Sequence, residues 1–421
     1  MTYDEALGYI HGVSNFFCKP GLDRITKLCE GLGNPQNKLK FIHVGGTNGK
    51  GSFCAMTESI LRSAGYKVGL FTSPYVKQFN ERMRINGENI PNDILASLTE
   101  KIGAVADKMT DKPTEFELIT AIAFEYFRRE ACDVVVLEVG MGGRFDATNI
   151  IDTSILSVIT GVALDHIAFL GDTTQKIAAE KAGIIKSGVP VLFGGEDSDA
   201  LAVISSRARE MGSEFYHTDY SSLSIASADL SGTNFNYKDR KNLRISLLGS
   251  YQPRNAALVI DAVNLLRRQG LKIDDDALQI GLENARWSAR FEVIAKNPTV
   301  IFDGAHNAQG IEAAVESIKQ YFGKQRVVVF TGVLRDKDYD AISSKISEVA
   351  NAVFTITPDN PRALSAEEYA DLFRVKGVPA TACVSVSEAL TLGKQTASEG
   401  NTALCCLGSL YTYKEVTDCL G

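Results

Sequence analysis

The sequence predicts an α/β protein with two domains, and three observations lead to this fold class. Short runs rich in Val, Ile and Leu alternate with helical patterns, which is typical of a parallel sheet covered on both faces. The alternation pauses at residues 283–298 and then restarts. With 421 residues, the chain is too long for one ordinary core. We therefore expect one domain over residues 1–286 and a smaller one over residues 287–421.

The first domain is predicted to contain five buried parallel strands with helices between them. The strands are expected at residues 40–44, 67–72, 133–139, 154–160 and 189–194. The helices are expected at residues 52–64, 93–109, 116–129 and 174–185, where the patterns are helical. Residues 213–248 are more polar and alternate, so we expect antiparallel strands at a sheet edge there, followed by a helix over residues 254–269.

The second domain is predicted to be a Rossmann-like α/β domain. Its strands are expected at residues 299–302, 326–331, 352–357, 380–384 and 402–407. Its helices are expected at residues 310–321, 339–350, 366–374 and 387–398. This part of the sequence contains no glycine-rich phosphate-binding turn of its own.

A glycine-rich turn joins the first predicted strand to the first long helix. Residues 44–52 read VGGTNGKGS; their backbone N–H groups can wrap a phosphate chain, Lys50 adds positive charge and Ser52 opens the helix. The strict P-loop pattern is not met, because Val44 and Gly51 stand where it needs Gly and Ser or Thr. The alternative is a plain strand-to-helix turn. The strand, turn and helix together favour a P-loop ATPase domain that binds a nucleoside triphosphate.

The composition is that of a globular protein and argues against several functions. Apolar residues make up 45% of the chain and charged residues 23%, and the net charge of -7 argues against nucleic-acid binding. We see no run long and apolar enough to span a membrane, and the acidic N-terminus does not resemble a signal peptide. The eight scattered cysteines form no CxxC pair, so we expect reduced, buried thiols in a cytoplasmic protein rather than a zinc site.

Polar residues follow three predicted strands of the first domain, at the edge where α/β sheets bind ligands. Glu138 ends one strand, Asp165 and His166 follow the next, and Ser73 follows a third. Beside a phosphate turn, a carboxylate at this edge is placed to hold magnesium. The alternatives are a carboxylate that caps the next turn and a histidine with a structural role.

Four other positions stay open between a functional and a structural interpretation. Arg82 lies beside Phe79, which suits an anionic aromatic substrate or equally a solvated loop. Lys181 lies in an apolar helical stretch, where the simple interpretation is a buried stem with a solvated head. Asp303 ends a strand of the second domain and could accept from a ribose hydroxyl, and Arg290 at the junction could reach a nucleotide.

Eleven segments together resemble the Mur ligase superfamily, and within it the folylpolyglutamate synthase and dihydrofolate synthase family. They occur in the family's order and span nearly the whole chain. GTNGKGS alone fits several Mur ligases, whereas FNER and DGAHN indicate the folate branch. The segments are GTNGKGS (46–52), FTSPY (71–75), FNERMRING (79–87), TEFE (114–117), EVGMGGRFDATN (138–149), LDH (164–166), EKAGIIK (180–186), QPRNA (252–256), RWSARFE (286–292), DGAHN (303–307) and GVLRDKD (332–338).

The resemblance implies an ATP-dependent ligase that adds L-glutamate to the terminal carboxylate of a folate through an acyl phosphate. It leaves open whether dihydropteroate is also a substrate. It further implies Mg2+, as two ions, a possible need for K+, and carbamylation of Lys181, which turns a cation into a carboxylate-like metal ligand. We expect small-molecule substrates, no nucleic-acid or membrane partner, and a cytoplasmic monomer.

Positions that match the family's motifs imply a set of site residues. The resemblance implies catalytic roles for Lys50, Lys181 and His306. It implies ATP binding by Asn48, Gly49, Lys50, Gly51, Ser52, Asn255, Arg290 and Asp303. It implies metal binding by Ser73, Glu138 and His166. It implies folate binding by Pro20, Gly21, Arg82, Thr114, Glu115, Phe116, Glu117 and Phe145.

Two other functions compete with this interpretation. A Mur-type ligase that acts on a cell-wall precursor would need an extra N-terminal domain, whereas the phosphate turn begins at residue 46. A nucleotide switch without ligase chemistry would need neither Lys181 nor the FNERMR segment. The chain departs from the family at Tyr75, where His or Phe is common, and at Ala308, where Pro is common. Neither departure removes a charged catalytic group.

Overall fold

The computed structural model describes residues 1–13 and 21–420, and the chain divides into two compact units. The first unit comprises Met1–Ser221 and Asn255–Ala285, and the second comprises Ser222–Arg254 and Arg286–Gly421. Residues 222–254, which the expected boundary after residue 286 places in the first domain, thus group with the second unit. Within the described residues, no helix combines the length and the apolar composition needed to cross a membrane.

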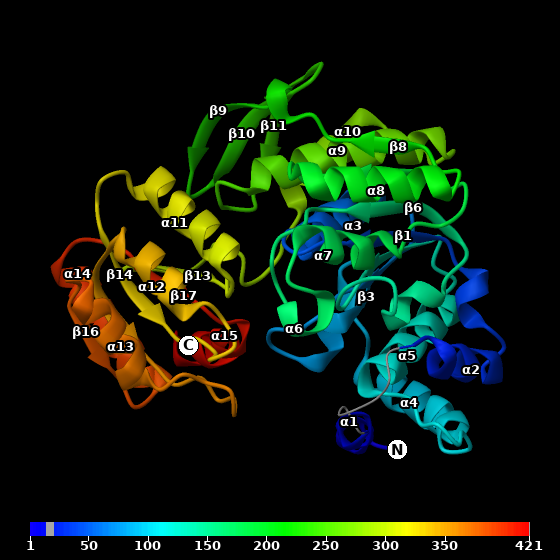
Figure 1. Ribbon diagram of the computed structural model, residues 1–421, viewed down its shortest axis with the longest axis horizontal. Helices are drawn as coiled ribbons and strands as arrows, with labels where there is room; N and C mark the ends of the chain where they lie inside the picture. The colour runs from blue at the N-terminus through cyan, green and yellow to red at the C-terminus, as the bar shows by residue number, and fades with distance from the viewer. Residues whose placement is uncertain (14–20, 421) are drawn as a thin grey trace. The chain divides into compact units, whose positions relative to one another are not determined.

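The first unit is built on an eight-stranded sheet with the strand order β4-β3-β2-β5-β1-β6-β7-β8. Figure 1 labels β1, β3, β6 and β8 of this sheet. All neighbours from β2 to β8 pair in parallel, and β3 and β4 extend the sheet as antiparallel strands. The five predicted parallel strands are therefore confirmed. The strands are β1 (Phe41–Gly45), β2 (Val68–Phe71), β3 (Met83–Ile85), β4 (Glu88–Asn89), β5 (Val134–Glu138), β6 (Ser154–Ile159), β7 (Val191–Phe193) and β8 (Phe215–His217).

Helices cover this sheet because its strands are apolar on both sides. Phe124 of α5 packs edge-on against Phe41 of β1 at 5.5 Å between ring centroids, and the glycine at position 281 lets α10 approach the backbone of Ile60 in α3. The helices are α1 (Tyr3–Gly12), α2 (Asp23–Gly31), α3 (Lys50–Ser63), α4 (Asn92–Ala106), α5 (Glu115–Arg129), α6 (Ile167–Leu170), α7 (Thr174–Ala182), α8 (Ser198–Glu210), α9 (Gln252–Arg268, which begins in the second unit) and α10 (Asp275–Asn284). Short 3-10 turns lie at Pro35–Lys38, Phe79–Arg82, Ala147–Ile150 and Tyr220–Ser222.

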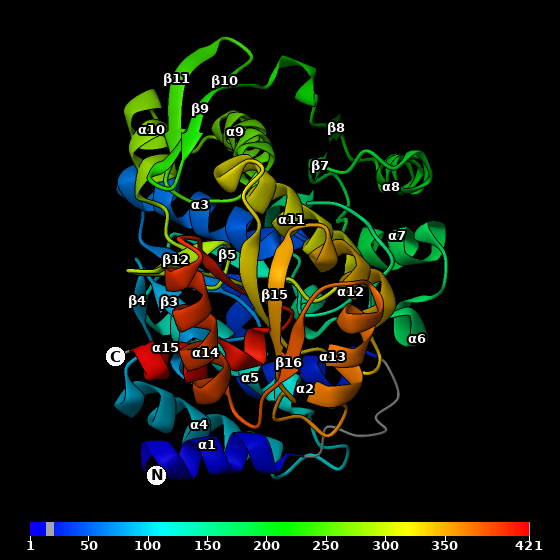
Figure 2. The same cartoon turned by 90° about the vertical axis from the view of Figure 1, so that its left-hand side faces the viewer.

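The second unit contains a six-stranded sheet with the order β12-β13-β17-β14-β15-β16, in which only β12 is antiparallel. Helices α11, α12 and α13 cover one face, and α14 and α15 cover the other (Figure 2). The strands are β12 (Glu292–Lys296), β13 (Thr299–Asp303), β14 (Val327–Thr331), β15 (Ala350–Thr355), β16 (Ala380–Ala382) and β17 (Leu404–Leu407). The helices are α11 (Ala308–Phe322), α12 (Tyr339–Ser347), α13 (Ala366–Val375), α14 (Val386–Glu399) and α15 (Tyr413–Leu420), with a 3-10 turn at Leu410–Thr412. The predicted Rossmann-like α/β arrangement is confirmed.

The polar segment at residues 213–248 differs from the prediction. Its first strand, β8, pairs in parallel with β7, so it is not antiparallel. The strands β9 (Ser224–Asp229), β10 (Gly232–Tyr237) and β11 (Arg240–Ile245) are antiparallel, but they form a separate three-stranded sheet rather than an edge of the large one. The alternating pattern indicates a half-exposed sheet correctly, but it carries no information about which strands become neighbours.

Candidate active site

The turn between β1 and α3 follows a backbone path that requires glycine at two positions. The φ angle is +140° at Gly46 and +86° at Gly49, a region that glycine adopts without steric cost. A Cβ atom on Gly46 would lie 2.0 Å from Oγ1 of Thr160, and one on Gly49 would lie 2.9 Å from Oδ1 of Asn255. The turn therefore packs directly against the residue after β6 and against a residue of α9.

Hydrogen bonds from the end of β6 fix this turn. The Thr160 hydroxyl donates to the Asn48 carbonyl at 2.7 Å, and the Thr47 amide donates to the Gly161 carbonyl at 2.9 Å. The Ala163 amide donates to Oγ1 of Thr47 at 3.0 Å. A turn fixed in this way presents its remaining amide groups without further ordering. No local sequence pattern indicates the roles of Thr47 and Thr160, because their partners lie more than 100 residues away.

Lys50 places its ammonium group over the turn. Its Nζ donates to the carbonyls of Gly46 and Thr47 at 3.0 and 3.1 Å. Helix α3 begins at Lys50, so its first amide groups and the positive end of its dipole lie at the same place. Ser52 in the first turn is buried and Gly51 precedes it. Charge and amide donors thus converge where a phosphate chain would bind.

Replacing Gly49 by alanine tests this arrangement, and Gly65 provides a matched control. Both residues have nearly equal φ angles, +86° and +88°, but only Gly49 has a neighbour within 4 Å of an added Cβ. We expect each variant to lose about 1 kcal/mol of unfolding free energy from the backbone change. Only Gly49→Ala is expected to raise the KM for ATP, by about tenfold, because the methyl group displaces Asn255 or the turn. Equal KM values in the two variants would contradict a nucleotide role for the turn.

The structure brings Ser73 and Glu138 together at the carboxyl edge of the large sheet. Glu138 ends β5, is buried, and accepts a hydrogen bond from the Ser73 amide at 3.0 Å through Oε2. His166 precedes α6 with φ +49° and an exposed side chain, and its amide donates to Oδ1 of Asp165 at 2.9 Å. Within the described part of the chain, no three His, Cys, Asp or Glu side chains form a group that could hold a metal ion. A metal held here would therefore need ligands from a bound substrate as well.

Lys181 is buried in α7, with 3% of its surface exposed. Burial, together with the positive charge of Lys50, lowers the pKa of its ammonium group to about 7, while Asp165 and Asp146 oppose the shift. The loop after β5 lies on this part of α7: a Cβ on Gly143 would lie 3.0 Å from the Lys181 carbonyl. The Lys181 side chain is thus a buried amine with a pKa near neutral pH, rather than a solvated lysine.

A buried network holds the loop between β5 and β6. Asp146 accepts from the amide and hydroxyl of Thr148 at 3.1 and 2.6 Å, and from the Met141 amide at 2.9 Å. Thr148 Oγ1 also lies 2.9 Å from Nε2 of His43, whose pKa burial lowers to about 3, so that this histidine is neutral. Burial raises the pKa of Asp146. No sequence pattern predicts this network, although DATN lies within a segment that matches the family.

The residues expected to bind folate through TEFE have structural partners. Thr114 and Glu117 form the capping box that begins α5, and Glu117 accepts from Nε of Arg24 at 3.0 Å. Glu115 lies 3.1 Å from Nδ1 of His11. Phe116 packs near Phe71 of β2 at 6.0 Å between ring centroids, and a Cβ on Gly140 would lie 2.5 Å from its ring. Phe116 therefore stands beside the ends of the strands that carry Ser73 and Glu138.

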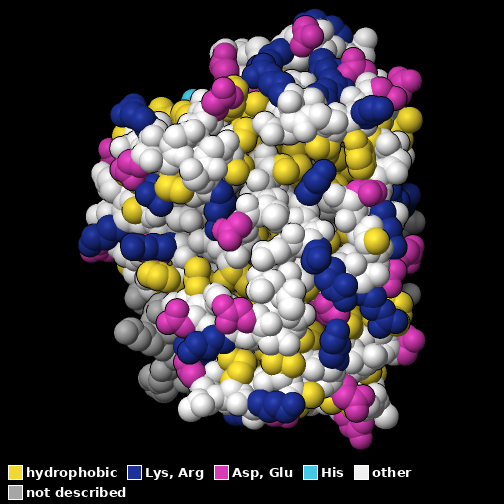
Figure 3. Space-filling view, turned by 90° about the vertical axis from the view of Figure 1, so that its right-hand side faces the viewer, with side chains coloured by type: hydrophobic (Ala, Val, Ile, Leu, Met, Phe, Trp, Pro, Cys, Tyr) yellow, Lys and Arg dark blue, Asp and Glu magenta, His cyan; other side chains and the backbone are white. Residues whose placement is uncertain are grey.

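Two further residues expected to bind folate, Arg82 and Phe145, each take part in a contact between an arginine and an aromatic ring. The Arg82 guanidinium lies 5.2 Å from the Tyr75 ring centroid and 5.6 Å from that of Phe79. Phe145 is 46% exposed, and the Arg144 guanidinium lies 5.1 Å from its ring centroid. Of the expected Pro20-Gly21 turn, Gly21 is partly exposed and Pro20 lies outside the described residues. On the face drawn in Figure 3, the described acidic and basic side chains are interspersed.

The second unit holds the remaining predicted residues at the carboxyl end of β13. Asp303 ends this strand and is buried, and its pKa is raised by burial although Arg290 opposes the shift. A Cβ on Gly304 would lie 2.8 Å from Nη1 of Arg290, so the guanidinium lies against the turn after β13. His306 Nδ1 lies 2.9 Å from the Gly304 carbonyl, which can only accept, so Nδ1 carries a proton. Arg290, Asp303 and His306 thus belong to one cluster.

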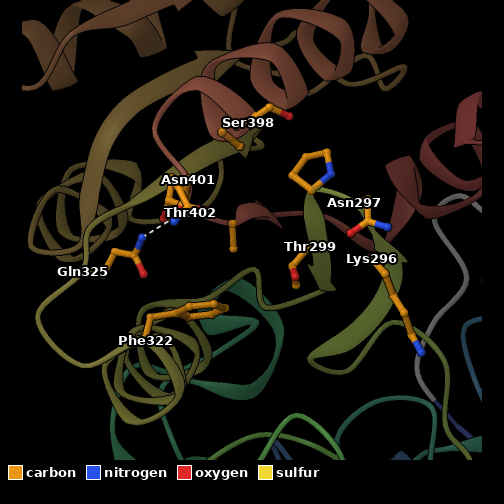
Figure 4. Close-up of a pocket in the computed structure, with 11 residues that line it drawn as sticks. Lys296, Asn297, Thr299, Phe322, Gln325, Ser398, Asn401 and Thr402 are labelled. Atoms are coloured by element: carbon orange, nitrogen blue, oxygen red, sulfur yellow. Dashed lines mark hydrogen bonds between the residues drawn. The ribbon is translucent and has the colours of Figure 1, made fainter.

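A cavity of about 460 Å³ lies at the opposite end of the same sheet (Figure 4). Thr299 at the start of β13, and Thr402 and Ala403 just before β17, line it together with Phe322 at the end of α11. Ligands of open α/β sheets bind at the carboxyl ends of the strands, whereas this cavity is at the amino ends. The cavity is therefore separate from the Asp303 cluster of the same unit.

Comparison with known proteins identifies relatives over nearly the whole chain. The Mur ligase middle domain matches residues 44–263, and the Mur ligase glutamate ligase domain matches residues 289–410. The dihydrofolate synthase/folylpolyglutamate synthase of Bacillus subtilis is 39% identical over 381 residues, which cover 88% of each chain.

Solved structures show the same similarity. Folylpolyglutamate synthase of Mycobacterium tuberculosis, complexed with ADP and AMPPCP, superposes with a TM-score of 0.90 at 27% identity and covers 100% of this chain and 99% of that one. Escherichia coli FolC in complex with DHPP and ADP has a TM-score of 0.88 at 30% identity, covering 100% of this chain and 98% of that one. In both cases the likeness extends over both units.

Proposed function

This chain belongs to the folylpolyglutamate synthase and dihydrofolate synthase family of Mur-type ligases, and from that premise we propose that it joins L-glutamate to the terminal carboxylate of a folate. It is an ATP-dependent ligase that forms an amide bond. The family membership favours this function over a ligase of cell-wall precursors and over a nucleotide switch. The observation that carries the proposal within this chain is the fixed phosphate turn with Lys50 above it.

In the proposed reaction, a carboxylate oxygen of the folate attacks the γ-phosphorus of ATP and ADP leaves, giving an acyl phosphate. The amino group of glutamate then attacks the carbonyl carbon, and the tetrahedral intermediate releases phosphate. Lys50 and the amides of the turn stabilise charge on the transferred phosphoryl group. His306, whose Nδ1 is oriented by the Gly304 carbonyl, presents Nε2 as a base for the proton of the attacking amine.

The donor set at the carboxyl edge of the large sheet fits magnesium. Mg2+ binds through one or two carboxylates together with substrate phosphates and water, rather than through a cage of protein ligands. Glu138, oriented by the Ser73 amide, supplies such a carboxylate, and we propose the Ser73 hydroxyl and His166 as further ligands, with two ions in all. The metal would neutralise charge on the phosphates of ATP when bound.

The burial of Lys181 supports its proposed carbamylation. A neutral amine adds CO2 to form a carbamate and releases one proton, and a pKa of about 7 leaves much of this amine neutral at physiological pH. We expect 13C-labelled bicarbonate to give a carbamate signal in the NMR spectrum of the wild-type protein that is missing in Lys181→Met. Identical spectra would contradict the modification but not the ligase function.

The first experiment measures incorporation of labelled L-glutamate with ATP, in parallel with tetrahydrofolate and with dihydropteroate. Product with tetrahydrofolate alone would identify an enzyme that only extends the glutamate tail, and product with both would identify a bifunctional synthase. We expect no incorporation when ATP is left out. No product with either acceptor would overturn the proposed substrate class.

The proposal also covers the response to K+, the oligomeric state and the cellular location of the enzyme. Activity is expected to respond to K+ at constant ionic strength, which substitution of K+ by a larger cation tests. We propose that the enzyme acts as a monomer, which sedimentation of the active protein tests. We place the reaction in the cytoplasm, because the described cysteines are free and all but Cys419 are buried.

A further inference from the structure

The backbone on both sides of Arg290 adopts the left-handed region. The φ angle is 60° at Ala289 and 43° at Phe291, and neither residue is glycine. Residues in this region persist only where their surroundings hold them firmly, and they are found preferentially at functional sites. Residues 289–291 therefore form a strained arch with Arg290 at its centre, and the contacts that hold the arch determine where the guanidinium points.

Two carboxylates hold the arch, one at each end. Oε2 of Glu292 accepts from the Ala289 amide at 2.7 Å, and Oδ2 of Asp303 accepts from the Phe291 amide at 3.1 Å. The carbonyl of Ala289 accepts from the Gly304 amide at 2.9 Å. Both amides that flank Arg290 are thus bound to carboxylate oxygens, which are the stronger kind of acceptor.

Each of these carboxylates is in turn fixed by a tyrosine. The Tyr413 hydroxyl donates to Oε2 of Glu292 at 2.7 Å, and the Tyr251 hydroxyl donates to Oδ2 of Asp303 at 2.8 Å. Tyr413 is 1% exposed and packs edge-on against Phe302 at 4.9 Å between ring centroids. The buried interior of the unit is therefore connected through Tyr413 and Glu292 to the arch.

We propose that Glu292, held by Tyr413, is a positioning residue that directs Arg290 towards the nucleotide. The inference rests on the proposed function and on the ATP contact of Arg290 that the family resemblance implies. A role as a helix cap would explain Glu292 more simply. However, Oε2 of Glu292 accepts from the amide of Ala289, which precedes a strand rather than a helix. Glu292 therefore stabilises a conformation that is unfavourable by itself, and loss of its oxygen releases the arch.

The test compares Glu292→Ala, Glu292→Gln and Tyr413→Phe with the wild-type enzyme. We expect Glu292→Ala to raise the KM for ATP about tenfold, with the KM values for glutamate and folate unchanged. Glu292→Gln is expected to have a KM for ATP close to that of the wild type, because the amide oxygen of Gln still accepts from the Ala289 amide. In an Arg290→Ala background, Glu292→Ala is expected to have no further effect on the KM for ATP.

The control is Glu214→Ala, which removes an exposed carboxylate that also accepts from a tyrosine, Tyr216, at 2.5 Å. It is expected to leave every KM unchanged. An unchanged KM for ATP in Arg290→Ala would overturn both the nucleotide contact and this inference. If Arg290→Ala raises the KM but Glu292→Ala does not, or if the two effects multiply in the double variant, only the positioning role is overturned. Circular dichroism of each variant reports misfolding. Tyr413→Phe keeps the ring and removes only the hydroxyl that holds Glu292, so it distinguishes misfolding from a loss of the Arg290 position.

Discussion

Replacing Lys50 by methionine is expected to lower kcat for glutamate ligation by about 10³-fold, because one fixed positive charge at a phosphoryl-transfer site has an effect of this size. The ammonium group lies 3.0 and 3.1 Å from two carbonyls of the phosphate turn, which hold it at the turn. The variant also loses these two hydrogen bonds, and we expect its unfolding free energy to fall by about 1 kcal/mol. Single-turnover measurement of acyl-phosphate formation isolates the affected step.

The matched control is Lys67→Met, which removes a half-exposed lysine that pairs with Glu130 at 3.2 Å. We expect this control to keep full activity, because an exposed ion pair contributes about 0–1 kcal/mol to stability and nothing to the reaction. Activity of Lys50→Met within tenfold of the wild type would contradict the role of Lys50. Equal losses in both variants would indicate a general effect of charge on folding.

Replacing Lys181 by methionine is expected to lower kcat by about 10²-fold or more, because the site loses the group that carries the proposed carbamate. Compared with protein whose Lys181 is unmodified, the same variant is expected to be more stable. Burial makes the ammonium form costly, and a methionine of similar length carries no charge. Lys176→Met on the same helix is the control, since Lys176 is exposed and pairs with Asp172 at 2.8 Å. In Lys181→Ala, added acetate is expected to restore part of the activity by supplying a carboxylate.

The pH dependence of stability provides a second measurement on Lys181. Its folded-state pKa, about 7, lies below the unfolded value of 10.5. Between these two values the unfolded chain binds more protons than the folded one, so unfolding free energy rises with pH across this window. We expect urea titrations to show this slope in the wild type and a smaller one in Lys181→Met. The same slope in both proteins would show that Lys181 titrates normally, and full activity of the variant would exclude the carbamate from the reaction.

The local features of the fold could be predicted because they depend on residues that are close in sequence. Runs such as VVVL in β5 identify buried parallel strands by composition alone. The predicted helices differ from the observed ones by a few residues at their ends, for example residues 52–64 against α3 at Lys50–Ser63. The prediction failed at residues 213–248, where periodicity indicates strands but not their partners. Three short strands there pair only with each other and form a sheet of their own.

Some features of the candidate site could also be predicted from neighbouring residues, and others could not. The phosphate turn could be recognised because the glycines, Lys50 and the start of α3 occupy one short stretch, and such a turn has its own chemistry. The roles of TEFE could not be separated, because a capping box and a substrate contact use the same residue types. The interpretation of Lys181 as a solvated lysine also could not be decided until its 3% exposure was known.

Strand composition, turn chemistry and ordered motifs are properties of neighbouring residues, so the two-part α/β ligase with one phosphate turn could be predicted from them. The contacts that hold the site became visible only in the folded chain: Thr160 against the turn, Asp146 with Thr148, and Glu292 with Tyr413 at a separation of 121 residues. Burial and hydrogen bonding between distant segments depend on which strands become neighbours in the sheet. The strand pairing that forms is the one that minimises the free energy of the whole chain, so no short stretch of sequence is enough to predict it.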